Sequence, residues 1–322
     1  MGDSTTKVAL APGELGRVMD RWFPDDLLES SEVVANGFFN MTYRVRLARR
    51  GEVYLRVAPP EGAPVMRYER SALRAEVMAL RLVRDRTSVP VPDVIVVDDS
   101  RESIARSFIV LSAIKGEALD DARSGLDASQ LRDLGASIDD VHRQFHGIAG
   151  EAFGPVVRPA PKSARWSEVL AELVEDVIAD ARDASHRLPV DANRIRRIVH
   201  ASAATLDLVT RPVFVHWDLW DGNLFVDSTK SRISGVIDFE RAIWADPLMD
   251  FAFRRSAPRW EGTVYLRSLI ATVPARLRSA IYDVYFLMLC HVEASYRARP
   301  VRDEWLESEL HDAIEEAERL FG

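Results

Sequence analysis

The chain has 322 residues, of which 47% are hydrophobic and 29% are charged, and its formal net charge is −8. This length and composition are typical of a globular protein with one or two domains. A surface that binds nucleic acid is usually basic, so the negative charge argues against DNA or RNA as a partner and suits a cationic small molecule. The single cysteine, Cys290, excludes an intramolecular disulfide and argues against a cysteine-based zinc site.

The sequence shows no targeting or membrane segment. The N-terminal segment has no apolar stretch after a basic start, so it predicts no secretory signal. The longest apolar stretch, residues 284–292, is only about half as long as a membrane span. These features predict a cytoplasmic protein that does not associate with membranes.

The first part of the chain carries the signals of β-strands. Hydrophobic and polar residues alternate over residues 43–47 and 52–57, and the segment between them has the length and the glycine of a hairpin turn. The spacing of Leu73, Val77 and Leu80 predicts a helix. Two further strands are expected at 94–97 and 108–111, after prolines that would break a helix.

After residue 111 the pattern becomes mainly helical, with apolar stripes over 131–145 and 166–177 and again from Tyr282 onward. Short strand-like segments interrupt it at 213–215, 224–226 and 233–237. The sequence therefore predicts an α+β chain with two lobes and a ligand cleft between them. The predicted parts are an N-terminal lobe over 1–111, a hinge over 112–117 and a helical C-terminal lobe over 118–322.

Polar residues cluster beside the strand-like segments of the second lobe. His216, Asp218 and Asn223 lie between two of these segments, and Asp238 follows the third. Carboxylate and amide oxygens at neighbouring strand ends form the kind of site that binds Mg²⁺ together with phosphate oxygens. The cluster therefore predicts an oxygen-rich site for a hard cation.

The pattern His216-x-Asp218-x-x-x-x-Asn223, followed by Ile237-Asp238-Phe239, resembles the catalytic signature of the aminoglycoside phosphotransferase and choline kinase family. The segment Asp246-Pro247-x-x-Asp250 resembles the stretch that follows this signature in the family. The resemblance implies a bilobal, protein-kinase-like fold with a small β-rich N-lobe and a larger helical C-lobe. It also implies transfer of the γ-phosphate of ATP, or of GTP, to a hydroxyl group of a small molecule.

The resemblance assigns roles to the residues of this signature. Asp218 would orient the acceptor hydroxyl and take its proton, while His216 would be a structural member of the catalytic loop. Asn223 and Asp238 would hold Mg²⁺ against the nucleotide phosphates. Asp246 and Asp250 would brace the loop by hydrogen bonds.

The resemblance also places nucleotide-binding groups in the N-lobe. Residues 35–43 stand where the family has its phosphate-covering loop, and Asn40 or Thr42 could reach a phosphate oxygen; the alternative is a plain β-turn. None of the four lysines lies in the third strand, where the family has a cation, so Arg56 takes that place. Glu76 on the following helix would pair with it. The alternatives are an exposed arginine on an edge strand and a solvated glutamate.

Two further segments are interpreted from the same resemblance. The backbone of Ser112 and Ile114 would hydrogen-bond the nucleotide base at the hinge. Trp217 stands where many relatives have glycine, so its indole either packs against the lobe or stacks on the acceptor. Independently of the resemblance, Asp221 and Gly222 form a good turn dipeptide, and a turn is the preferred interpretation of Asp221.

The acceptor is the least determined part of the prediction. The resemblance implies an antibiotic such as an aminoglycoside, with a sugar, an amino alcohol or another metabolite as the alternative. The acidic segment 302–319 is either a solvated helix face or an anionic wall for a polycationic acceptor. A catalytically silent, kinase-like nucleotide-binding module is a further alternative. A protein kinase is disfavoured because a multi-glycine loop is missing. The oligomeric state is open.

Overall fold

The computed structural model describes residues 6–35, 37, 39–157, 163–255, 263–297 and 304–321, without the side chains of 252–255 and 321. The chain forms two compact units. The first, called here the N-terminal unit, groups Met1–Val65, Pro92–Ile114 and Tyr296–Arg299. The second, the C-terminal unit, groups Met66–Val91, Lys115–Ser295 and Pro300–Gly322.

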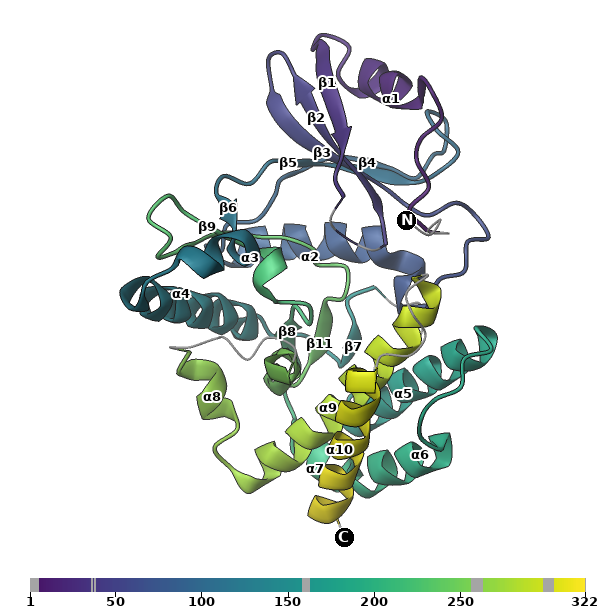
Figure 1. The fold of residues 1–322 in the computed structure, drawn as a ribbon, viewed down its shortest axis with the longest axis vertical. Helices are drawn as coiled ribbons and strands as arrows, with labels where there is room; N and C mark the ends of the chain where they lie inside the picture. Colours follow the sequence, from purple (N-terminus) through teal and green to yellow (C-terminus); the bar gives the residue numbers. More distant parts are fainter. Residues whose placement is uncertain are drawn as a thin grey trace. The chain divides into compact units, whose positions relative to one another are not determined.

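The N-terminal unit is built on a five-stranded antiparallel sheet with the strand order β1-β2-β3-β5-β4 (Figure 1). The predicted hairpin is confirmed, because β2 and β3 pair in continuous register from Met41 opposite Val57 to Leu47 opposite Gly51. Gly51 has φ 82°, a left-handed conformation that favours glycine in such a turn. The strands are β1 Leu28–Val33, β2 Met41–Leu47, β3 Gly51–Val57, β4 Val94–Asp98 and β5 Phe108–Ser112.

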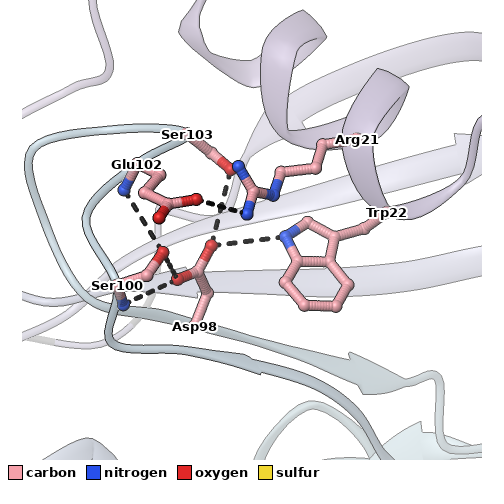
Figure 2. Close-up of polar contacts among 6 residues, drawn as sticks. All are labelled: Arg21, Trp22, Asp98, Ser100, Glu102 and Ser103. Carbon is pink, nitrogen blue, oxygen red and sulfur yellow. Dashed lines mark hydrogen bonds and ion pairs between the residues drawn. The ribbon is translucent and has the colours of Figure 1, made fainter.

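A helix that the sequence analysis did not predict, α1 (Glu14–Trp22), packs on this sheet. Its Val18 and Met19 are buried in one core with strand residues such as Val45 and Leu55. Polar contacts reinforce the packing, as Figure 2 shows. The Trp22 indole donates a hydrogen bond to the buried Asp98 carboxylate at 3.3 Å, and Asp98 also accepts from the hydroxyls of Ser100 and Ser103.

The C-terminal unit is mainly helical, as predicted. The helix that covers the first apolar stripe begins at a capping box, in which the Asp127 carboxylate accepts hydrogen bonds from the backbone N–H groups of Ser129 and Gln130. The helices are α2 Ala72–Arg86, α3 Leu119–Ala122, α4 Ala128–Gly147, α5 Trp166–Asp183, α6 Ala192–Ala201, α7 Ala203–Leu206, α8 Tyr265–Leu269, α9 Val273–Tyr296 and α10 Glu304–Phe321. Short 3₁₀ turns are η1 Arg67–Ser71, η2 Arg123–Gly125, η3 Asp221–Asn223 and η4 Pro247–Arg255.

Two small sheets interrupt these helices and present the polar cluster. The loop from β8 to β9 carries residues 216–223, and the loop from β10 to β11 carries Asp238. One sheet has the order β10-β9-β6, with β6 Glu117–Ala118, β9 Leu224–Val226 and β10 Ile233–Val236. The other has the order β7-β11-β8, with β7 Gly154–Pro155, β8 Val213–Val215 and β11 Ile243–Ala245.

The predicted α+β class is confirmed by these elements, with the sheet in the N-terminal unit and most helices in the C-terminal unit. The predicted helix around Leu73 is α2. Its contacts place it in the C-terminal unit. Within the described residues, no helix is both long enough and apolar enough to span a bilayer.

Candidate functional site

His216 joins the two loops of the polar cluster. Its ring is fully buried, and its Nδ1 accepts a hydrogen bond from the backbone N–H of Asp218 at 3.2 Å. Nε2 therefore carries the proton and donates to the carbonyl of Ile237 at 3.1 Å. Burial lowers the pKa of His216, which keeps the ring neutral. The geometry suits the structural role predicted for this residue.

Asp218 and Asn223 are held together by hydrogen bonds across the catalytic loop. The side-chain nitrogen of Asn223 donates to the Asp218 carbonyl at 2.8 Å and to the Asp218 carboxylate at 3.1 Å. Both bonds fix the amide orientation, since a carbonyl and a carboxylate accept but do not donate. The amide oxygen of Asn223 is the atom left to bind another group.

The Asp218 carboxylate lies in an electrostatic environment suited to a proton acceptor. Burial, the largest cause, raises the pKa of Asp218 to about 7, and the negative charges of Asp238 and Glu293 add to the shift. The positive charge of Arg241 and the hydrogen bond from Asn223 oppose it. A general base works best with a pKa near the operating pH.

The donor atoms of the site fit Mg²⁺. The Asn223 amide oxygen and the Asp238 carboxylate are hard oxygen ligands, and Mg²⁺ is usually bound by one or two carboxylates together with phosphates and waters. Asp238 has φ 68°, a strained conformation for a residue with a side chain, of the kind found at functional sites. In the part of the chain that the structure describes, no group of three or more His, Cys, Asp or Glu residues is placed to hold a metal by itself.

Asp250 braces the catalytic loop as predicted. One carboxylate oxygen accepts a hydrogen bond from the backbone N–H of Trp217 at 2.9 Å, and the other contacts His146 Nε2 at 3.0 Å. Burial alone would raise the pKa of Asp250, but the hydrogen bond from His146 and the nearby histidine charges lower it. Asp250 therefore connects the catalytic loop to helix α4.

Asp246 does not brace the loop, which corrects the prediction. Its carboxylate accepts hydrogen bonds from Arg278 Nε and the Tyr282 hydroxyl, both at 2.7 Å, and from the backbone of Leu248. Arg278 and Tyr282 lie on α9, whereas Asp246 comes just before η4. The residue therefore fixes η4 to α9, and its effect on the catalytic loop is indirect.

Trp217 packs inside the unit. It is 4% exposed, and its indole stacks on the Tyr285 ring with centroids 5.1 Å apart and planes 8° apart. The packing interpretation of Trp217 is confirmed.

Arg241 is a further residue of this site, and it was not predicted from the sequence. It forms an ion pair with Glu293 at 2.8 Å, and its guanidinium lies over the Tyr68 ring, 5.1 Å from the centroid. The Tyr68 hydroxyl also donates to Glu293 at 3.0 Å. The only sequence signal was an arginine three positions after Asp238, whose partners lie far away in the chain.

Arg56 and Glu76 lie on the predicted elements. Arg56 is on β3, which has neighbours on both sides in the sheet, so the alternative of an edge-strand arginine is wrong. Glu76 is on α2 and is 1% exposed, so it is not a solvated glutamate. The two residues belong to different units, and their ion pair stays a prediction.

Asn40 lies at the end of the predicted phosphate-covering segment and is buried. Two residues of that segment, Asn36 and Phe38, are outside the described residues. Gly37 has φ 94°, which favours glycine. Lys7, which was not predicted to take part, donates from its ammonium group to the carbonyls of Ala35 at 3.0 Å and Gly37 at 3.1 Å.

The two predicted hinge residues differ in what their backbone does. The Ser112 N–H donates to the Asp93 carbonyl at 2.9 Å, so it is already engaged within the N-terminal unit. Ile114 forms no comparable backbone hydrogen bond with a described residue. Recognition of the nucleotide base by the backbone of Ser112 or Ile114 stays a prediction.

The antiparallel sheet of one unit and the helical unit with this catalytic loop define a kinase-like phosphotransferase. The chain belongs to the phosphotransferase enzyme family, whose sequence profile matches residues 31–285. It is accordingly a phosphotransferase with an alcohol group as acceptor, and the predicted family and enzyme class are confirmed. No curated protein sequence matches the chain significantly.

Solved structures agree with this assignment. The streptomycin–ATP–APH(2")-IIa ternary complex has a TM-score of 0.64 and 14% identity, covering 98% of this chain and 99% of that chain. A thermostable mutant of aminoglycoside phosphotransferase APH(4)-Ia, in a ternary complex with AMP-PNP and hygromycin B, has a TM-score of 0.64 and 15% identity, covering 95% and 97%. The GDP and kanamycin complex of APH(2")-IIia has a TM-score of 0.62 and 16% identity, covering 95% and 99%. At these identities the likeness shows the fold.

Proposed function

We propose that this protein transfers the γ-phosphate of ATP or GTP, with Mg²⁺, to a hydroxyl group of a small-molecule antibiotic such as an aminoglycoside. The observation that carries the proposal is the arrangement of Asp218 and Asn223. In this hydrogen-bonded pair, the Asp218 carboxylate has a raised pKa and would accept the proton. The amide oxygen of Asn223 would bind the metal.

In the proposed reaction, Asp218 accepts a hydrogen bond from the acceptor hydroxyl and takes its proton as the oxygen attacks the γ-phosphorus. The bond between the γ-phosphorus and the β–γ bridging oxygen breaks, and the nucleoside diphosphate leaves. Asn223 and Asp238 would hold Mg²⁺, which neutralises charge on the phosphates. The rest of the catalysis is positioning and electrostatic stabilisation. Arg56 with Glu76, Asn40 and the backbone at Ile114 would bind the nucleotide.

The comparisons support the choice of reactants. The similar structures contain nucleotides (ATP, AMP-PNP or GDP) and aminoglycosides (streptomycin, hygromycin B or kanamycin). Both adenine and guanine nucleotides occur among them, which is why the proposal includes ATP and GTP.

The structure favours one interpretation of the acidic C-terminal segment. In α10 the buried side chains are apolar, among them Leu310 and Ile314, while Glu304, Asp312 and Glu315 are exposed. Glu318 is paired with Arg194 at 2.6 Å. This is the pattern of a helix with a solvated acidic face, so the proposal for a cationic acceptor does not depend on α10.

The test is a coupled assay of nucleoside diphosphate release with ATP or GTP, with and without Mg²⁺, against aminoglycosides, other antibiotics, amino alcohols and sugars. We expect acceptor-dependent release that requires Mg²⁺. Asp218→Asn should lower kcat by about 100- to 10,000-fold while the circular dichroism spectrum stays unchanged, because only the proton acceptor is lost.

Two other outcomes would contradict the proposal. If the wild type binds nucleotide but transfers nothing to any acceptor, the protein is a nucleotide-binding module without turnover. If neither ATP nor GTP binds in the presence of Mg²⁺, the assignment of the site itself is wrong.

A further inference from the structure

A buried ion pair anchors the catalytic loop at a point that the proposed chemistry does not use. Arg123 of η2 donates from Nε and Nη2 to the two carboxylate oxygens of Asp221 in η3, the second contact at 2.7 Å. Both side chains are only 9% exposed, and they are 98 residues apart in the sequence. Such two-point pairing is specific to arginine, whose planar guanidinium matches a carboxylate.

The pair fixes the turn that carries the proposed metal ligand. Asp221 is the first residue of η3 and Asn223 is the last. The Asn223 backbone N–H donates to the Trp220 carbonyl at 2.9 Å, which closes this turn, and its side chain donates to Asp218. A displacement of Asp221 would therefore move Asn223 relative to the Asp218 base.

Arg123, the other residue of this ion pair, belongs to the segment after the predicted hinge. There, β6 pairs with β9, placing Glu117 opposite Val226 and Ala118 opposite Phe225. Helix α3 follows β6 directly and is itself followed by η2, whose first residue is Arg123. The catalytic loop is thus held by this segment both in its middle, through Arg123, and at its end, through β6.

The energetics of such a pair favour a role in orientation. Removing two charges from water costs about as much free energy as their attraction returns, so a buried ion pair adds little net stability compared with apolar residues. The pair instead fixes an orientation, because two parallel hydrogen bonds determine both the distance and the plane of the Asp221 carboxylate.

We propose that Arg123 and Asp221 are positioning residues, which hold Asn223 where it can bind Mg²⁺ beside Asp218. This inference rests on the proposed function. Neither residue touches the reacting atoms. Residues that orient a metal ligand typically change metal affinity or activity about 10- to 100-fold when they are replaced.

The test measures nucleotide hydrolysis, with water as acceptor, as a function of free Mg²⁺ in the full chain. In Arg123→Gln and in Asp221→Asn, we expect the Mg²⁺ concentration at half-maximal rate to rise about tenfold and kcat to fall about tenfold. The double variant should be no worse than either single variant, because both remove the same anchor. The matched control is Arg196→Gln, which removes an exposed two-point pair with Glu175 and should leave the Mg²⁺ dependence unchanged.

A purely structural role would lower thermal stability without changing the Mg²⁺ requirement of the folded enzyme, and that result would overturn the inference. If the neutral variants do not fold, Arg123→Lys keeps the charge but offers no planar fork, and it should still raise the Mg²⁺ requirement several-fold. An unchanged requirement in Arg123→Lys overturns the inference as well. A wild type without Mg²⁺-dependent turnover, both with water and with every acceptor of the screen, overturns the proposed function, and this inference with it.

Discussion

Lys7 is a single side chain that supports a loop by donating hydrogen bonds to its backbone carbonyl groups. Its ammonium group donates to the carbonyls of Ala35 and Gly37, and burial lowers its pKa. A lysine has three N–H donors and no acceptor, so it can satisfy several carbonyls at one point. The residue thereby holds the backbone on both sides of residue 36, in the segment predicted to cover the phosphates.

Replacing Lys7 by methionine keeps the length of the side chain and removes the donors. We expect nucleotide affinity, measured by isothermal titration calorimetry, to fall by about tenfold, or ~1.4 kcal/mol, because the carbonyls lose their charged partner. Lys230→Met is the matched control, since Lys230 pairs with the exposed Glu117 in the other unit. Equal affinity in wild type and Lys7→Met would show that the loop does not depend on Lys7.

Individual residues could be predicted where local spacing defines their role. Asp218 and Asn223 are five positions apart in one loop, and they are hydrogen-bonded in the structure. Lys7, Arg123 and Arg241 could not be predicted, because each acts through a partner far away in the sequence. Such partners are determined by tertiary packing, which composition and periodicity do not encode.

At the scale of a single element, helix α1 is attached to the sheet by hydrogen bonds to a buried carboxylate. Asp98 is buried and accepts hydrogen bonds from Trp22 and from two serines (Figure 2). Burial alone would raise the pKa of Asp98, but the hydrogen bonds from Ser100 and Trp22 lower it. The charged carboxylate is therefore the form that the native structure favours.

Asp98→Asn should lower the free energy of unfolding by about 2 kcal/mol, because a hydrogen bond to a charged group is lost and an amide N–H₂ faces other donors. Urea denaturation measures this. Arg21→Gln is the control, since it breaks the neighbouring exposed pair with Glu102, shown in Figure 2, and should change stability by less than about 0.5 kcal/mol. If both variants lose the same stability, burial does not determine the strength of this attachment.

The alternating strands of the N-terminal sheet were predicted, whereas β1 and β11 were missed. In β2 and β3, buried residues alternate with exposed or half-buried ones, and this alternation was visible in the sequence. β1 has the sequence Leu-Glu-Ser-Ser-Glu-Val and lies at the sheet edge, where no residue is fully buried, so it has no apolar period. β11 has three residues and was missed although it pairs with both β7 and β8, whereas β8 and β9, which are equally short, were predicted.

The free energy of unfolding of the whole protein depends on pH through two buried groups, His142 and Asp218. Their pKa values shift in opposite directions when the chain folds. Burial, the main cause, lowers the pKa of His142 to about 4, partly opposed by the charge of Asp250. In the unfolded chain a histidine has a pKa of about 6.5. Between these values the unfolded state binds a proton that the native state does not, so acid destabilises the fold through His142. Asp218 acts in the opposite sense, because its raised native pKa makes the folded state bind the extra proton.

These opposing effects are separated by comparing variants. The contribution of His142 is fully present above about pH 6.5 and is lost as the pH falls toward 4, at about 1.4 kcal/mol per pH unit. His142→Gln removes this slope, so the stability difference between wild type and variant should shrink by about 2 kcal/mol between pH 6.5 and pH 5. Urea denaturation without Mg²⁺ at several pH values measures it. His200→Gln is the control, because this ring is exposed in the folded protein and the difference should stay constant. A constant difference for His142→Gln as well would mean that the buried ring takes up its proton in the native state.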